Sequence, residues 1–320
     1  IKKLLGMEGS IHLGIEEIQD VLQFAKAESY FFENEAEAIY TYILFYQANQ
    51  KKSAFEFIKQ SNLNHRKSLL ANFLKVKIAQ RSGNNDIALR WLSERPIQKV
   101  YAEFHYMEFL EGLSKLRKLD SGCIVHFEKY VSRFDGLHYI KEAYQKLAWA
   151  HLIFYNDENQ YFRYMKMVRN FGKDQLDGDK QALSESKAGK VPNAILLKAR
   201  ILYDGGYYNQ ALLLLSQNGS DLLKNDFDTL EYYYRMGRIS QALNDYKKAI
   251  SYYNYLTENR KFQSSYFVCN ASLQSGLIYE EKKEWKMAEK YFKQCLGLSP
   301  DTYKLSIHQK AKTGLQRLKK

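Results

Sequence analysis

The residue pair best spaced to hold a metal ion is Cys123 and His126. Three residues apart on a helix, they would lie on one face and could supply half of a metal site. No second cysteine or histidine pair is spaced to complete it. The three cysteines, at positions 123, 269 and 295, are also too few and too widely spaced for a disulfide framework. The sequence therefore predicts no metal and no cofactor.

Signatures of catalysis are absent from the sequence. It contains no G-x-S-x-G, no H-E-x-x-H, no phosphate loop and no dinucleotide fingerprint. The seven histidines are scattered, and carboxylates are abundant without a recognisable acid–base partner. We therefore expect that the chain is not an enzyme.

Two arginines point instead to binding. Arg200 and Arg238 are 38 residues apart, and Tyr203 and Tyr234 lie beside them in the sequence. A guanidinium group matches the geometry of a carboxylate, and tyrosine offers a rigid amphipathic surface. One hypothesis is that this stretch binds an extended acidic or C-terminal peptide segment. The alternative is that the arginines pair with carboxylates such as Glu231 and hold no ligand.

The elements that must position these side chains are helices. The 320-residue chain is 45% hydrophobic and 26% charged, a globular balance, and it has only 3 prolines. Proline interrupts helix interiors, and the abundant leucine, alanine, lysine and glutamate favour them. The composition therefore predicts an all-α chain.

A repeated interval organises these helices. In "GLIYEEKKEWKMAEKYFKQCLGLSP" (276–300), a small residue is followed 12 positions later by another and then by an aromatic ring. A small residue lets two helices approach closely while the ring fills the gap. The same interval recurs upstream. The matching positions are Gly276, Ala288 and Phe292; Gly237, Ala249 and Tyr253; and Ala199, Ala211 and Leu215.

The interval predicts a helix–turn–helix unit of about 34 residues, the tetratricopeptide period. We predict one right-handed α-solenoid over residues 1–320, with about seven helix pairs. An N-terminal helix within 1–34, capped near Ser10, precedes divergent repeats in 35–170, clear repeats in 192–300 and a capping helix in 301–320. The turns "RSGNND", "YNDENQ" and "YDGGYY" are expected to separate the two helices of a pair.

Residues 171–191 interrupt the period. The surrounding stretch "NFGKDQLDGDKQALSESKAGKVPN" is polar, contains glycine and has mixed charge. We interpret it as an insertion, either a solvated loop or a segment that projects from one face and carries binding.

In a solenoid of helix pairs, the first helix of each pair lines the concave surface. Counting places along each repeat gives the side chains that face inward. The predicted peptide-binding residues are Arg200, Arg238, Tyr203, Tyr234, Asn193, Lys77 and Trp149.

The repeats from 192 to 300, with residues 69–96, resemble tetratricopeptide repeats. A narrower resemblance, through "KLLGMEGSIHLGIEEI", "GLHYIKEAYQKLAWAHLI", "GDKQAL" and "ILLKARILYDGGYYNQAL", is to an uncharacterised bacterial tetratricopeptide family. The opening segment is also distantly similar to a eukaryotic tetratricopeptide family linked to inclusion-body clearance. The bacterial resemblance implies helical repeats, no known catalytic residues, further sequence before Ile1, and a cell-envelope setting on the periplasmic side rather than the cytoplasm.

The net charge of +12 permits nucleic acid, anionic lipid or acidic peptide partners. We expect a protein or peptide partner, and a scaffold function. One alternative is single-stranded nucleic acid, because 26 tyrosines accompany the basic residues. Another is a helper domain for an enzyme or assembly whose active part lies outside this chain. No run of about 18 apolar residues is present, so we expect no membrane span.

Overall fold

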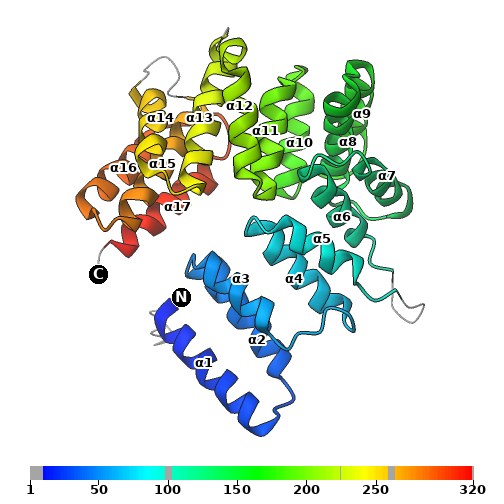
Figure 1. The fold of residues 1–320 in the computed structure, drawn as a ribbon, viewed down its shortest axis with the longest axis vertical. Coiled ribbons are helices and arrows are strands. Elements are labelled where there is room, and N and C mark those ends of the chain that lie inside the picture. Colours follow the sequence, from blue (N-terminus) through cyan, green and yellow to red (C-terminus); the bar gives the residue numbers. More distant parts are fainter. Residues whose placement is uncertain (1–9, 98–102, 224, 259–263, 319–320) are drawn as a thin grey trace. The chain divides into compact units, whose positions relative to one another are not determined.

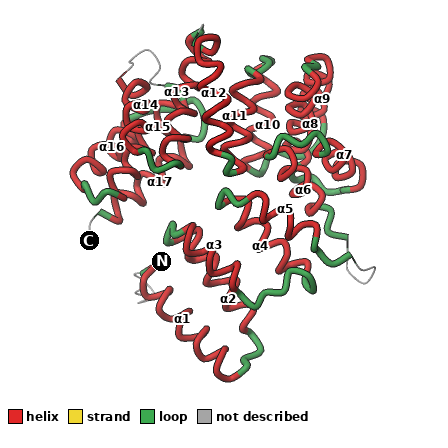
Figure 2. Tube along the Cα trace, viewed as in Figure 1, coloured by secondary structure: helices red, strands yellow, loops and turns green. Residues whose placement is uncertain are grey.

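The computed structural model describes residues 10–97, 103–223, 225–258 and 264–318. Within these ranges every regular element is helical, as Figures 1 and 2 show. The all-α class predicted from the sequence is therefore confirmed. The chain divides into an N-terminal unit, up to Lys190 with Asp204–Gly206, and a C-terminal unit formed by Val191–Tyr203 and the residues from Tyr207 onward. A single continuous solenoid over residues 1–320 stays a prediction.

The N-terminal unit consists of one helix, four helix pairs and a closing helix. Consecutive helices pack against each other, and α10 packs on both helices of the α8/α9 pair. The second helix continues into a short π-helical segment, η2, which the sequence did not predict. The elements are α1 (Ile11–Glu28), α2 (Glu33–Tyr42), η2 (Ile43–Gln47), α3 (Lys51–Gln60), α4 (Leu69–Arg81), α5 (Asn85–Ser93), α6 (Tyr106–Arg117), α7 (Cys123–Arg133), α8 (Ile140–Tyr155), α9 (Glu158–Asn170) and α10 (Asp177–Ala188).

The C-terminal unit contains three further pairs, which complete the seven predicted pairs, and a last helix. The helices are α11 (Ala194–Gly205), α12 (Tyr208–Leu222), α13 (Asp226–Ala242), α14 (Tyr246–Glu258), α15 (Tyr266–Glu281), α16 (Trp285–Gly297) and α17 (Lys304–Arg317). The last helix packs on both α15 and α16. The capping helix predicted for the C-terminal end is therefore present.

The small-residue interval works as the sequence predicts. A Cβ atom added to Gly276 would lie 2.6 Å from the ring of Phe292, and one added to Gly237 would lie 2.4 Å from the ring of Tyr253. Both rings are fully buried. Such distances leave no room for a side chain, so glycine in the first helix of these two pairs is what allows the ring of the second helix to enter.

Local signals also place the helix ends. Ser10 accepts a hydrogen bond from the backbone N–H of Leu13 and so caps α1. The predicted turns contain left-handed residues, including Gly83 before α5 and Asn156 before α9. Glycine and asparagine adopt this conformation at low cost, so each first helix stops there and the second can begin.

The solvated-loop interpretation of residues 171–191 is wrong, because Asp177–Ala188 form α10. Its buried side chains are small or polar, and they include Asp179, Ala182 and Ser186. The Asp179 carboxylate accepts hydrogen bonds from the backbone N–H groups of Tyr139 and Glu142, at 2.7 and 3.0 Å. Hydrogen bonds rather than an apolar stripe hold α10 to α8, and this is why its polar composition looked like a loop.

The terminal helix α17 combines an apolar and a polar face. Ile307 and Ala311 are buried against α15 and α16. At the C-terminal end of α17, Arg317 donates two hydrogen bonds of 2.6 Å to the carboxylate of Glu280 on α15. Lys310 and Lys312 are exposed. This arrangement covers the end of the stack while it keeps charged groups outermost.

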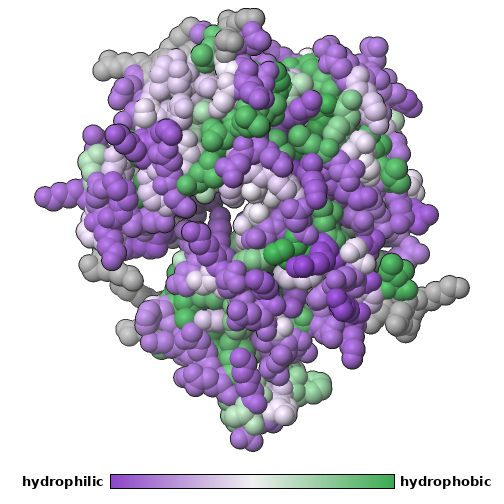
Figure 3. Space-filling view, in the orientation of Figure 1, coloured by the Kyte–Doolittle hydropathy of each residue, from purple (hydrophilic) through white to green (hydrophobic). Residues whose placement is uncertain are grey.

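Hydrophilic side chains cover most of the surface visible in Figure 3, between smaller apolar patches. Among the described residues, no helix combines the length and the apolar character that crossing a bilayer requires.

Candidate peptide-binding surface

Two of the predicted tyrosines of the C-terminal unit meet at the predicted Arg238. The guanidinium of Arg238, on α13, donates a 3.0 Å hydrogen bond to the Tyr234 hydroxyl on the same helix. It also donates one of 2.7 Å to the Tyr203 hydroxyl on α11. The guanidinium carbon lies 5.0 Å from the centre of the Tyr203 ring, so the contact is also a cation–π interaction. The repeat spacing thus brought together three of the predicted residues.

Arg238 has no carboxylate partner within the described residues. Its Nε is buried and makes no hydrogen bond. The nearby carboxylate of Glu231 pairs with Arg235 at 2.7 Å. The interpretation that Glu231 neutralises Arg238 is therefore wrong, because Arg235, one turn after Glu231 on the same helix, takes that position. In the described part of the chain, Arg238 is a half-buried cation held by the hydroxyls and rings of tyrosines.

The surrounding tyrosines keep this cation charged. Burial lowers the pKa of Arg238, but the oxygens of Tyr203, Tyr234, Tyr253 and Tyr266 outweigh burial and raise it well above its usual value. Burial likewise raises the pKa of Tyr234, and the guanidinium of Arg238 is the main group that lowers it, so that the net direction is down. The tyrosine oxygens therefore stabilise the charged form of the guanidinium.

Three residues that the sequence analysis did not select extend this row onto α15. The hydroxyls of Tyr234 and Tyr266 are 3.5 Å apart. Asn270 donates a 2.7 Å hydrogen bond to the Tyr266 hydroxyl and accepts one of 3.0 Å from Gln274. The sequence could have identified Asn270 as an inward-facing residue. It occupies the same place in its repeat as Glu231 does in the preceding repeat. We call Tyr203, Arg238, Tyr234, Tyr266, Asn270 and Gln274 the polar row.

The other two predicted residues of this unit lie near its beginning. Asn193 precedes α11, and its side-chain oxygen accepts hydrogen bonds from the backbone N–H groups of Ile195 and Leu196. Its amide nitrogen donates a 3.0 Å hydrogen bond to Asp228. Asn193 therefore has a structural role as a helix cap. Arg200 is half-buried on α11, one turn before Tyr203.

In the N-terminal unit, Lys77 of α4 donates a 3.2 Å hydrogen bond to the Tyr106 hydroxyl of α6. Burial is the main cause that lowers the pKa of Lys77 to about 8. The neighbouring charges of Arg81 and Arg117 lower it further, and the carboxylate of Glu142 opposes this shift. Lys77 thus contacts the first helix of the next pair in a locally basic environment, and its role in peptide binding stays a prediction.

The structure places Trp149 beneath α10. Its indole N–H donates a 2.7 Å hydrogen bond to the Glu185 carboxylate, which also accepts hydrogen bonds from Gln145 and Tyr161. The Trp149 side chain is buried. The face of α8 predicted to bind a peptide is therefore covered by a helix of the same chain.

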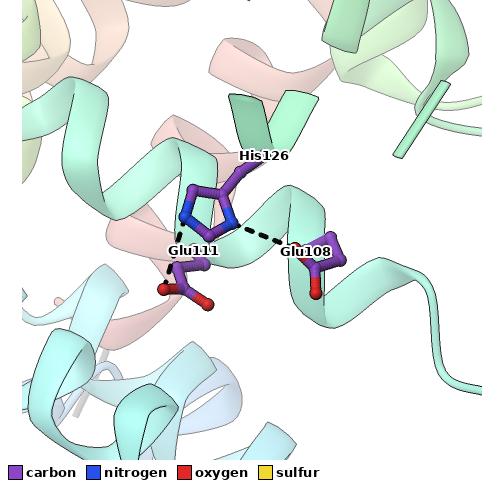
Figure 4. A group of neighbouring side chains, drawn as sticks. All are labelled: Glu108, Glu111 and His126. Atoms are coloured by element: carbon purple, nitrogen blue, oxygen red, sulfur yellow. Dashed lines mark hydrogen bonds and ion pairs between the residues drawn. The ribbon is translucent and has the colours of Figure 1, made fainter. Parts of the chain in front are cut away.

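His126 lies against carboxylates rather than beside Cys123. Figure 4 shows its imidazole between two glutamates of α6, with Nδ1 3.0 Å from Glu108 and Nε2 3.4 Å from Glu111. The three side chains are close enough to hold a metal ion. However, Arg95 contacts both carboxylates, at 3.3 and 2.7 Å. These contacts make the cluster a charge-compensated ion-pair network.

Cys123 takes no part in that network. The thiol is fully buried, and burial raises its pKa to about 12. Among the described residues, His126 is grouped with Glu108 and Glu111, and Cys123 is not part of that group.

The comparison with known families bears on the C-terminal unit. The model of the family described as tetratricopeptide repeat matches residues 230–259 and 270–302. These two ranges cover all but the first turn of α13 and of α15, together with α14 and α16, the pairs with the Gly237–Tyr253 and Gly276–Phe292 contacts. No curated protein matches the chain. The match and the all-α, helix-pair architecture together support a tetratricopeptide-repeat protein.

Proposed function

We propose that this chain is a non-enzymatic scaffold that binds an extended acidic or C-terminal peptide of another protein along the polar row. Tetratricopeptide repeats generally mediate protein–protein interactions, which supports the coarser statement of a scaffold. The proposal of an acidic or C-terminal peptide rests on the environment of Arg238. This residue is a half-buried cation with no carboxylate partner in the described part of the chain. A carboxylate from a partner would supply the missing counter-charge.

The remaining members of the row suit an extended peptide. They come from α11, α13 and α15 and carry hydroxyl and amide groups rather than charges. Tyr203, Tyr266 and Gln274 are half-buried, whereas Tyr234 and Asn270 are buried behind them and hold their hydrogen-bonding partners. An extended backbone exposes a donor and an acceptor at each residue, and such groups can pair with either. Specificity then depends on the single charged position at Arg238.

The tyrosines outside the row favour peptide over nucleic acid. Tyr233 and Tyr255 stack on each other, with ring centres 3.7 Å apart and planes inclined by 17°. Tyr279 and Tyr291 are also stacked, at 5.4 Å. Rings that already stack on each other offer fewer free faces to bases. Nucleic acid is therefore the competing outcome of the test below, and the helper-domain role is compatible with the same surface.

The test is a fluorescence anisotropy titration of the chain with labelled acidic peptides, each made with a free and with an amidated C-terminus. The variant Arg238→Gln keeps hydrogen-bonding capacity but removes the charge. The control Lys248→Gln removes one charge from an exposed lysine of α14 in the same unit. We expect binding to the wild type and to the control, and a tenfold or greater loss in Arg238→Gln.

Equal affinity of all three proteins would contradict a role for Arg238. Tight binding of an unlabelled oligothymidine competitor, with an affinity that falls steeply as the salt concentration rises, would instead indicate that the chain binds single-stranded nucleic acid. The bacterial origin and the periplasmic setting stay predictions based on sequence resemblance.

A further inference from the structure

Two of the three cysteines face each other inside the C-terminal unit. Cys269 of α15 and Cys295 of α16 have sulfur atoms 3.7 Å apart. The Cys269 thiol also lies 3.6 Å from the carbonyl oxygen of Cys295. Both side chains are fully buried, in a cluster with Leu273, Phe292 and Ile307. The pair could not be recognised from the sequence spacing, because the two cysteines are 26 positions apart and lie on different helices.

We propose that Cys269 and Cys295 form a disulfide that joins α15 to α16, through exchange with a small-molecule disulfide. The sulfur atoms must approach from 3.7 Å to about 2.05 Å, the length of an S–S bond. They already touch across the two helices, so modest side-chain rotations suffice for this approach. The inference concerns covalent modification and is independent of peptide binding.

The exchange balances in two steps. The Cys269 thiolate attacks one sulfur of the small disulfide, forms a mixed disulfide and releases one small thiol. The Cys295 sulfur, having lost its proton, then attacks the Cys269 sulfur of the mixed disulfide and releases the second small thiol. The protein gives up two hydrogen atoms in all, and the oxidant becomes two thiols.

The order of attack follows from the environment. The hydrogen bond with Cys295 is the main cause that lowers the pKa of Cys269, and Lys304 acts in the same direction. The same hydrogen bond raises the pKa of Cys295. Cys269 is therefore the thiol that ionises first, and Cys295 is the resolving thiol.

The helix α17 helps to enclose the pair. Its residues Ile307 and Ala311 belong to the cluster that encloses both sulfurs. Because both sulfurs are fully buried, an oxidant reaches them when this cluster opens or before it has packed during folding. The disulfide therefore forms readily during refolding and, once formed, is shielded from reductants.

The experiment unfolds the reduced chain in urea and refolds it in a mixture of oxidised and reduced glutathione, followed by thiol counting in denaturant and intact mass. With three cysteines in the chain, the wild type is expected to fall from three free thiols to one. Its mass is expected to fall by about 2 Da. A refolded wild type that keeps three free thiols, or carries only glutathione adducts, overturns the proposal.

Cys123 provides the matched control, because it lies in the N-terminal unit. Cys123→Ser should fall from two free thiols to none, whereas Cys269→Ser and Cys295→Ser should not lose two hydrogen atoms. A mass loss that disappears in Cys123→Ser would assign the bond to a different pair and overturn the inference. The oxidised wild type should also unfold at a higher temperature than the reduced protein, and treatment with dithiothreitol in denaturant before refolding should remove the shift.

Discussion

The indole N–H of Trp149 donates a 2.7 Å hydrogen bond to Glu185, and this contact binds α10 to the face of α8 that the sequence assigned to a ligand. The same carboxylate accepts hydrogen bonds from Gln145, at 2.6 Å, and from Tyr161, at 3.1 Å. A single side chain thus satisfies three donors from two helices. The contact explains how a polar segment becomes the closing helix of the N-terminal unit.

We expect Glu185→Ala to lower the free energy of unfolding of the N-terminal unit by about 2–3 kcal/mol, because three partly or fully buried donors lose their acceptor. Urea denaturation followed by circular dichroism measures this change. The control is Lys187→Ala, an exposed position on the same helix. A loss of similar size in both variants would mean that helix propensity, rather than the carboxylate, decides the stability of α10.

Acid should weaken the ion-pair network of α6 and α7. The hydrogen bond from His126 is the main cause that lowers the pKa of Glu108 from 4.5 to about 2, and Lys129 and Arg95 contribute to the same shift. The pKa is lower in the folded state, so this stabilisation is fully present above pH 4.5 and is lost as the pH falls towards 2. We expect Glu108 to contribute about 2 kcal/mol at pH 6, after allowance for partial exposure.

The measurement is the urea midpoint of unfolding at pH 6 and at pH 3, for the wild type and for Glu108→Gln. Neutral glutamine cannot titrate, so the difference between the two pH values should shrink in the variant. Glu17→Gln removes an exposed carboxylate of α1 and should leave that difference unchanged. An unchanged difference in Glu108→Gln would show that other carboxylates dominate the acid response.

Hydroxyl deletion tests the polar row. We expect Tyr203→Phe to lower the free energy of unfolding of the C-terminal unit by about 1–2 kcal/mol, because the charged donor Arg238 loses an acceptor at 2.7 Å. Tyr255→Phe is the control, since Tyr255 is an exposed tyrosine that stacks on Tyr233. Chemical denaturation of both variants gives the comparison, and equal stability of the two would argue against a strong Arg238–Tyr203 bond.

The sequence was most informative where one residue type decides the packing. Gly237 and Gly276 are needed for close approach of a ring, so their spacing predicted the pairs α13/α14 and α15/α16. The same count placed Arg238 beside Tyr203 and Tyr234. These relations are set by the repeat period and need no knowledge of the rest of the chain.

Partners that depend on long-range contacts could not be predicted in this way. The α10 helix is held by the carboxylates of Asp179 and Glu185. They accept hydrogen bonds from Tyr139 and Gln145, which lie 40 positions earlier in the sequence. His126 pairs with Glu108 across two helices, 18 positions apart. Carboxylates are common on helix surfaces, so no local pattern shows which of them becomes buried against a partner.

The close approach at Gly276 makes the sharpest stability prediction. A Cβ atom there would lie 2.6 Å from Phe292, whose ring is also in contact range of Gly314 on α17. The ring is enclosed on both sides and cannot yield, so Gly276→Ala should cost about 1–3 kcal/mol despite the better helix propensity of alanine. The matched control is Gly297→Ala at the end of α16, where a Cβ atom would meet nothing within 4 Å.

Thermal and urea unfolding of the two alanine variants measure the difference, and the double variant Gly276→Ala/Phe292→Leu identifies its cause. Leucine is smaller than phenylalanine, so the cost of Gly276→Ala measured in the Phe292→Leu background should be smaller than in the wild type. If the cost is the same in both backgrounds, the ring does not set the spacing of α15 and α16. The small-residue interval would then reflect helix propensity rather than packing.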